Sequence, residues 1–313
     1  MHVPDATKRE VERRRALPAE SRHAGRLQIK IPELEQFTIE RGGRGCNFAR
    51  VSEQTVELHV ERQGTGDAVV LAHGFGGSAR NFRVQAKALA GEATVLTYDA
   101  RGHARSAAPD RAEAYGLERL IDDYERVAAQ GGAWVVAGGI SLGALTALGF
   151  AARRPERVRG LLLASLPGTD EKRRRWALDF AAAIEQQGLD AAGSAFVWGE
   201  RSRFDPAGAK LIRLGLLEHP PHALAHILRQ TLAVLPNLAA LAAPLADAPF
   251  PVTILVGAED APALEPSRAL AAALPRATFV VVPNAGHVLN LVAPAVFNEH
   301  LSALLHAGRS DAR

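Results

Sequence analysis

The chain has 313 residues, a formal net charge of +3 and a mean hydropathy of −0.03, which is ordinary for a globular protein. This small basic excess does not predict a nucleic-acid-binding surface, which needs cations concentrated on one face. A single cysteine, Cys46, excludes an internal disulfide, and no apolar run of about 18 residues predicts a membrane span. Because its start has no apolar secretory signal, we expect a soluble cytoplasmic protein.

Residues 1–42 are mixed in charge and poorly periodic, and we interpret them as an N-terminal appendage. Within them the sequence LQIKIP alternates apolar and polar residues, as an edge strand does. The sequence leaves open whether this appendage is an arm that binds a partner or one that forms a homo-oligomer.

Residues 43–165 alternate short apolar runs with segments of helical spacing. The predicted strands in this part are CNFARVS, TVELHVER, AVVLAHG, ATVLTYD, AWVVAGG and RVRGLLLAS. The predicted helices between them are SARNFRVQAKAL, GLERLIDDYERVAAQ and LGALTALGFAARR. This alternation predicts an α/β fold, with a mostly parallel central sheet that is covered by helices on both faces.

The alternation stops over residues 166–245, where helical segments occur without a strand-like run. It resumes over residues 246–313 with PVTILVG, PSRALAAAL, TFVVVP and APAVFNEHLSALLH. We therefore expect a helical lid, or cap, inserted after the sixth predicted strand, with the second part of the core domain following it.

One serine lies where a predicted buried strand meets a predicted helix. The sequence GISLG at residues 139–143 is a G-x-S-x-G motif, and it follows the apolar run Trp134–Ala137. Its small flanking residues allow the sharp strand-to-helix turn of a nucleophile elbow. This context predicts that Ser141 is a nucleophile rather than an ordinary turn residue.

A serine hydroxyl needs a base to remove its proton, and the base needs an orienting acid. Asp260 follows the predicted strand TILVG, and His287 follows the last predicted strand. In a parallel sheet all three groups would lie at the carboxyl edge, where ligands bind in such folds. Glu259 is the alternative acid, but the position relative to Gly257 favours Asp260.

Acyl transfer also needs two donors for the oxyanion. The N–H of Leu142, the first residue after the elbow serine, is one candidate. The second is the N–H of Phe75 in the loop HGFGGS, which follows a predicted strand. Both candidates are backbone groups, so the prediction depends on loop geometry rather than on side-chain chemistry.

The other polar residues near these loops are expected to be structural. His73 and His103 are interpreted as loop histidines that form hydrogen bonds close to the site. Asp99 and Arg101 are interpreted as a pair that stabilises a loop. No spacing of histidines, cysteines and carboxylates predicts a metal site, so we expect neither a metal nor a cofactor.

The predicted lid contains three features that could shape a binding site. Trp176 and Trp198 are candidate pocket walls, although core packing is an equally good interpretation. The basic run Lys172–Arg175 is interpreted as the solvated start of a helix. The alternative is that this run meets an anionic substrate at the mouth of the site.

Five sequence blocks, in order, resemble those of the α/β-hydrolase superfamily over residues 46–305. They are HGFGGS, YDARGHARS, GISLGALTALGFAARRPERVRGLLLAS, VGAED and PNAGHVLNLVAPAVFNEHLSALL. The last block is most similar to the 3-oxoadipate enol-lactonase and small carboxylesterase branch. The resemblance implies an α/β-hydrolase fold and a serine hydrolase that cleaves a carboxylic ester or lactone. It assigns the nucleophile, the base, the orienting acid and the two oxyanion donors to Ser141, His287, Asp260, Phe75 and Leu142.

The sequence departs from the family pattern at two positions, since Ala104 and Ala144 stand where glycine is usual. Other functions also fit this family. The same triad serves C–C bond hydrolases and cofactor-free perhydrolases, and the fold carries non-catalytic ligand-binding proteins. We therefore expect a small-molecule ester or lactone as the partner, with no nucleic acid.

A dinucleotide-binding protein is the competing interpretation from another class. Residues 74–79 fit G-x-G-x-x-A after a predicted strand, and Asp99 ends the next strand. This interpretation leaves the elbow serine and the two predicted partners of Ser141 unexplained. We therefore favour the hydrolase.

Overall fold

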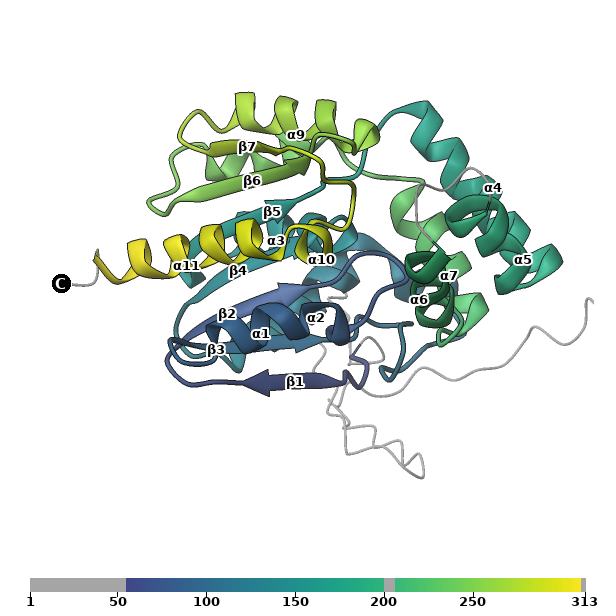
Figure 1. The fold of residues 1–313 in the computed structure, drawn as a ribbon, viewed down its shortest axis with the longest axis horizontal. Coiled ribbons are helices and arrows are strands. Elements are labelled where there is room, and N and C mark those ends of the chain that lie inside the picture. Colours follow the sequence, from purple (N-terminus) through teal and green to yellow (C-terminus); the bar gives the residue numbers. More distant parts are fainter. Residues whose placement is uncertain (1–54, 200–205, 311–313) are drawn as a thin grey trace, which may run out of the picture. The chain divides into compact units, whose positions relative to one another are not determined.

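Seven strands form one sheet in the computed structural model, which describes residues 55–199 and 206–310 (Figure 1). The strand order in the sheet is β1-β3-β2-β4-β5-β6-β7. β1 is antiparallel to β3, and all other neighbours are parallel. The predicted α/β fold with a mostly parallel sheet is confirmed. The strands are β1 Val60–Gln63, β2 Asp67–Ala72, β3 Ala93–Tyr98, β4 Val135–Ile140, β5 Val158–Ala164, β6 Val252–Gly257 and β7 Thr278–Val282.

Helices cover both faces of this sheet. Successive residues of β2 alternate between two apolar cores, with Val69 and Leu71 in one and Val70 and Ala72 in the other. Because both faces are buried, the central strands are almost continuously apolar. The first core includes α1 Arg83–Leu89, α10 Leu289–Val292 and α11 Pro294–Ser310; the second includes α2 Leu117–Ala129, α3 Leu142–Arg153, α8 Leu238–Ala242 and α9 Ala261–Ala273.

Between β5 and β6 the described chain forms helices and no strand, as predicted. We call residues 166–245 the helical insertion. Figure 1 shows α4, α5, α6 and α7 grouped beyond one end of the sheet. Their apolar core includes Leu142, the residue after the elbow serine, so the insertion packs against the start of α3. These helices are α4 Glu171–Gln187, α5 Leu189–Gly193, α6 Pro206–Leu216 and α7 Pro221–Ile227.

The appendage predicted for residues 1–42 and the first predicted strand, residues 46–52, lie outside the described residues. The boundaries of the four predicted parts, 1–42, 43–165, 166–245 and 246–313, stay predictions. In the described part of the chain, none of the helices combines the length and apolar character needed to span a membrane.

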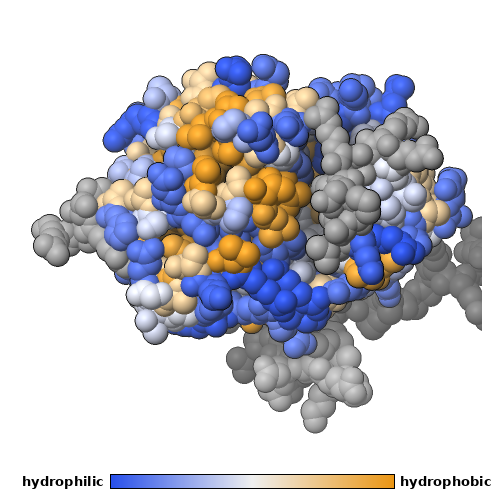
Figure 2. Space-filling model, in the orientation of Figure 1, coloured by the Kyte–Doolittle hydropathy of each residue, from blue (hydrophilic) through white to orange (hydrophobic). Residues whose placement is uncertain are grey.

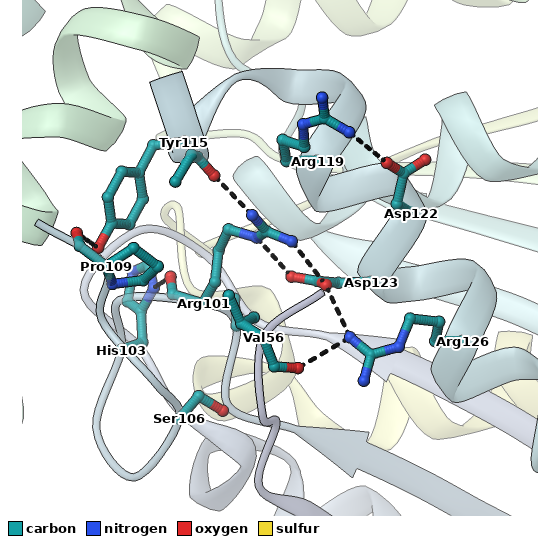
Figure 3. Close-up of polar contacts among 12 residues, drawn as sticks. Val56, Arg101, His103, Ser106, Pro109, Tyr115, Arg119, Asp122, Asp123 and Arg126 are labelled. Atoms are coloured by element: carbon teal, nitrogen blue, oxygen red, sulfur yellow. Dashed lines mark hydrogen bonds and ion pairs between the residues drawn. The ribbon is translucent and has the colours of Figure 1, made fainter. Parts of the chain in front are cut away.

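A buried ion pair anchors the loop that follows β3 (Figure 3). Arg101 donates from Nε and Nη2 to the two carboxylate oxygens of Asp123 on α2, at 2.6 and 2.8 Å. The two side chains are only 1% and 2% exposed. Arg101 also donates to the carbonyl oxygen of Ala114 at 2.6 Å. These contacts of Arg101 therefore fix the loop against α2 and against the segment that precedes α2.

The predicted pairing of Asp99 with Arg101 is wrong. Arg101 turns toward α2, and Asp99 instead accepts a hydrogen bond from Arg105 Nε at 2.7 Å. Burial raises the pKa of Asp123, and the hydrogen bonds from Arg101 only partly oppose it. The sequence places these residues in one loop, but their partners depend on how α2 packs against it.

Candidate active site

Ser141 lies on a sharp turn between β4 and α3. Its φ of 55° and ψ of −115° place a non-glycine residue in a region that side chains rarely adopt. Its N–H donates to the carbonyl oxygen of Ala164 on β5 at 2.9 Å, and the residue is 4% exposed. Such strained conformations persist only where the surroundings enforce them, and they cluster at functional sites.

The glycines of the G-x-S-x-G motif are required by close backbone packing. A Cβ on Gly143 would lie 1.9 Å from the carbonyl oxygen of Ala72, at the end of β2. A Cβ on Gly139 would lie 2.4 Å from the carbonyl carbon of Gly143. Only glycine at both positions allows α3 to begin this close to the sheet, and this approach fixes the turn at Ser141.

His287 and Asp260 are brought together by the loops after β7 and β6. His287 Nδ1 lies 2.8 Å from Asp260 Oδ2, and the side chains are 45% and 4% exposed, respectively. Because an ionised carboxylate only accepts, Nδ1 carries the proton and Nε2 is the basic nitrogen. Glu259, the alternative acid, is exposed and forms no side-chain hydrogen bond with a described residue. The geometry therefore favours Asp260.

Ser141 and this pair occupy the same edge of the sheet. β4, β5, β6 and β7 are consecutive parallel neighbours, so their carboxyl ends lie side by side. Within the described residues, no hydrogen bond joins the Ser141 hydroxyl to His287. Catalytic hydrogen bonds are often long before a substrate binds, so the contact between Ser141 and His287 stays a prediction.

The loop after β2 packs against the elbow. A Cβ on Gly74 would lie 3.4 Å from the Ser141 Cβ, which places this loop beside the serine. Neither the Phe75 N–H nor the Leu142 N–H donates to an acceptor among residues 55–199 and 206–310. Leu142 begins α3, and the first N–H groups of a helix have no partner within the helix. Both predicted donors thus have an N–H without an acceptor among these residues, and their role in an oxyanion hole stays a prediction.

Two buried histidines hold this loop, as their structural interpretation expects. His73 donates from Nδ1 to the carbonyl oxygen of Gly74 at 2.7 Å and accepts at Nε2 from the Ala100 N–H at 2.9 Å. His103 accepts at Nε2 from the Gly76 N–H at 3.2 Å. Burial lowers the pKa of His73 to about 4, so the ring is neutral at pH 7 and can accept.

A third histidine, His219, joins this group from the helical insertion. Its Nδ1 accepts from the Ala104 N–H at 2.7 Å, and its ring centroid lies 5.0 Å from that of His103. Ala104 has a φ of 41°, which explains why glycine is usual at this position in the family. The sequence did not identify His219, because no motif surrounds it.

Asp99 is committed to contacts within the protein. Its carboxylate accepts from the Ala79 N–H at 2.8 Å and from Arg105. Burial opposes ionisation of Asp99, but these hydrogen bonds outweigh it and hold its pKa below the usual range. A dinucleotide site needs this carboxylate free to accept from a ribose hydroxyl, so the competing interpretation loses its acidic residue.

The basic run at the start of α4 is not uniformly solvated. Lys172, Arg174 and Arg175 are exposed, whereas Arg173 is partly buried with its Cζ 3.9 Å from the centroid of the Trp176 ring. Trp176 and Trp198 are both partly buried against the core of the insertion, which agrees with core packing.

The surface next to His287 is apolar. Figure 2 shows a hydrophobic area over the place that α10 occupies in Figure 1. Leu291 and Val292 of this helix are exposed.

An open hollow of about 300 Å³ lies in the helical insertion, and its lining includes none of the predicted catalytic residues. It is formed by Gly168, Thr169, Asp170, Glu171, Arg174, Leu232, Ala233, Val234 and Leu235. No cluster of three metal-ligating side chains occurs in the described part of the chain.

A parallel sheet with a strained serine between strand and helix, and a histidine–carboxylate pair at the same edge, defines an α/β-type hydrolase. The model of the alpha/beta hydrolase family matches residues 69–300, and the chain belongs to this family. The protein is accordingly an enzyme of the hydrolase class. Within this family, its relatives and fold neighbours place the chain near the branch of small esterases and lactonases.

Three similar proteins illustrate this placement. An uncharacterized hydrolase of Bacillus subtilis, YraK, is 38% identical over 108 residues, which cover 34% of this chain and 39% of that protein. The 2-(acetamidomethylene)succinate hydrolase of Mesorhizobium japonicum is 28% identical over 271 residues, covering 79% and 91%. The enol-lactonase structure from Burkholderia xenovorans LB400 has a TM-score of 0.70 at 23% identity, covering 80% and 97%, and shows the shared fold.

Proposed function

We propose that the protein hydrolyses a carboxylic ester or lactone through Ser141, His287 and Asp260. The observation that carries the proposal is the 2.8 Å hydrogen bond between His287 Nδ1 and the buried Asp260. It lies at the sheet edge where Ser141 is held at positive φ. Because the Nδ1–H of His287 donates to Asp260, Nε2 is the ring nitrogen that takes the Ser141 proton.

The proposed reaction has two acyl-transfer steps. Ser141 Oγ attacks the carbonyl carbon while His287 takes its proton, and the oxyanion accepts from the N–H groups of Phe75 and Leu142. Collapse breaks the bond to the leaving oxygen, which receives the proton from His287. Water, deprotonated by His287, then attacks the carbonyl carbon of the acyl-enzyme. The bond to Ser141 Oγ breaks, the proton on His287 returns to this oxygen, and the carboxylic acid is released. With a lactone, the leaving alcohol stays attached to the acyl group, so the product is a ring-opened hydroxy acid.

Two comparisons support this substrate class. One relative, 34% identical over 140 residues, is named as a pimeloyl-[acyl-carrier protein] methyl ester esterase, and one fold neighbour is an enol-lactonase. C–C bond hydrolysis, perhydrolysis and non-catalytic binding are the alternatives on the same fold. A panel of esters and lactones that differ in acyl length and charge, assayed with and without peroxide and beside a 1,3-diketone as a C–C bond substrate, separates these activities. A cytoplasmic location, a homo-oligomer formed through residues 1–42 and the lack of a nucleic-acid partner stay predictions.

The test of the proposal is Ser141→Ala, assayed on p-nitrophenyl acetate and butyrate and with a fluorophosphonate probe. Turnover should fall by at least about a thousandfold and labelling should disappear, because the nucleophile is gone. Ser165→Ala is the matched control. Ser165 is a buried serine at the end of neighbouring β5, and its φ of 50° is also positive. Unchanged turnover in Ser141→Ala, with the fold intact by circular dichroism, would refute the proposal.

A further inference from the structure

Arg173 is a cation that the proposed acyl transfer does not use. It lies in the first turn of α4, where its N–H donates to the capping residue Asp170 at 2.7 Å. Its Nε is buried and has no hydrogen-bond partner. Among the described residues, no carboxylate forms an ion pair with its guanidinium, whereas the neighbouring Arg174 pairs with Glu171 at 3.1 Å. One arginine of the basic run is thus partly buried and has no ion-pair partner among the described residues.

The segment before α4, the helix that carries Arg173, packs against the helix that follows the predicted catalytic acid. A Cβ on Gly168 would lie 3.4 Å from the carbonyl oxygen of Pro262, so the segment before α4 contacts the first turn of α9. The residue that precedes this turn of α9 is Asp260. Burial lowers the pKa of Arg173 to about 10, and Asp260 and Asp170 partly oppose this effect. Arg173 is therefore charged at neutral pH and lies within the field of Asp260.

Aromatic contacts connect Arg173 to the other side of the site. The Trp176 ring under its guanidinium contacts Phe180, with centroids 5.4 Å apart. Phe180 in turn contacts Phe75, with centroids 5.9 Å apart. Phe75 carries one of the predicted oxyanion donors. These consecutive contacts connect Arg173, in the helical insertion, to the loop after β2, which packs beside Ser141.

A buried guanidinium N–H without an acceptor is unfavourable unless a ligand supplies one. Stacking on Trp176 holds the planar group in place but leaves its in-plane donors unused. The partner that best fits these parallel donors is a carboxylate. The Trp176 ring shields one face of the guanidinium and its Nε is buried, so such a contact is stronger there than in open water.

We propose that Arg173 binds a carboxylate carried by the substrate, so that the preferred substrates are esters or lactones with a second, anionic group. This inference rests on the proposed function and adds the substrate class. It makes Arg173 a specificity-determining residue, and it favours the anionic-substrate interpretation of one member of the basic run.

The test compares matched substrates. Monomethyl succinate, glutarate and adipate are assayed against methyl butanoate, pentanoate and hexanoate, which have the same chains without the second carboxylate. The wild-type enzyme should prefer the anionic ester in kcat/KM by about tenfold or more for at least one chain length. Arg173→Gln should abolish this preference mainly through KM, and Arg173→Lys should retain part of it. The matched control Arg174→Gln should keep the preference.

Other results overturn the inference. A wild-type enzyme without an anionic preference has no such subsite. An equal loss on both esters in Arg173→Gln assigns Arg173 a structural role, and an equal effect of Arg174→Gln assigns the preference to general surface charge. If no ester is hydrolysed, the proposed function fails separately. Calorimetry of glutarate and adipate binding to Ser141→Ala, with and without Arg173→Gln, then decides the inference, because Arg173-dependent binding supports it and Arg173-independent or absent binding overturns it.

Discussion

Gly143 packs against the carbonyl group of Ala72, so closely that a Cβ on Gly143 would lie 1.9 Å from that oxygen. This contact joins the start of α3 to the end of β2 and forces the turn that carries Ser141. Gly143→Ala must push the helix away from the sheet. We expect it to lower the free energy of unfolding by about 3 kcal/mol or more, since the clash is with backbone that cannot rotate away. Urea denaturation measures the change.

Gly215→Ala is the control for this prediction. Gly215 lies in α6, and a Cβ there would have no packing neighbour within 4 Å among the described residues. Alanine should raise stability by up to about 1 kcal/mol through its higher helix propensity. If both variants were equally stable, the close packing of Gly143 would not be what fixes the elbow.

Asp260, which contacts His287, and the adjacent Glu259, which does not, provide a variant and its matched control. Asp260→Asn should lower kcat by about ten-thousandfold, because an amide does not stabilise the imidazolium and permits the wrong tautomer. Glu259→Gln should change kcat by no more than about twofold, since Glu259 is exposed. Steady-state kinetics on p-nitrophenyl butyrate measures both. A larger loss of kcat in Glu259→Gln than in Asp260→Asn would show that Glu259, and not Asp260, orients His287.

Sequence reasoning predicted the geometry of the candidate site where one local pattern dictates it, whereas the chemistry of these residues stays a prediction. The elbow at Ser141 follows from two glycines at fixed spacing, and the positions of Asp260 and His287 follow from strand ends in a parallel sheet. These features are encoded within a few residues of each site residue. The fold class is encoded in the same way, by apolar runs that alternate with helical segments.

The failures concern contacts made between distant segments. Arg101 pairs with Asp123, 22 positions away, because α2 packs beside its loop. His219 and Arg173 lie in the helical insertion, whose sequence has helical spacing but no motif. The hydrogen bond between His219 and Ala104 depends on tertiary packing, which no local pattern specifies. Arg173 and Trp176 are three residues apart on α4, but their burial depends on how the insertion packs.

The ion pair of Arg101 and Asp123 makes a distinct stability prediction. Arg101→Met should lower the free energy of unfolding by about 3–5 kcal/mol, because it leaves a buried carboxylate with only the weaker Arg126 contact at 3.4 Å. The double variant Arg101→Met/Asp123→Leu should lose less than the single variant, since no unpaired charge stays buried. Equal losses in the two, measured by urea denaturation, would mean that packing rather than charge dominates at this site.

The three buried histidines predict how stability depends on pH. Burial lowers the pKa of His73 to about 4 and lowers the pKa values of His103 and His219. In the unfolded chain a histidine titrates near pH 6.5, so below that pH the unfolded state binds more protons than the native state. The contribution to stability is therefore complete above about pH 6.5 and is lost as the pH falls toward 4, by roughly 3 kcal/mol from His73 alone.

Two variants of the helical insertion test this origin of the pH dependence. His219→Asn keeps an acceptor for the Ala104 N–H but cannot be protonated, so the fall in unfolding free energy between pH 7 and about pH 4.5 should become smaller. His222→Asn, at an exposed position three residues along, should leave the fall unchanged. Urea denaturation across this range measures both slopes. If the unfolding free energy of His219→Asn fell with pH as steeply as that of the wild type, His219 would not contribute to the acid sensitivity. His73 and His103 would then account for the fall.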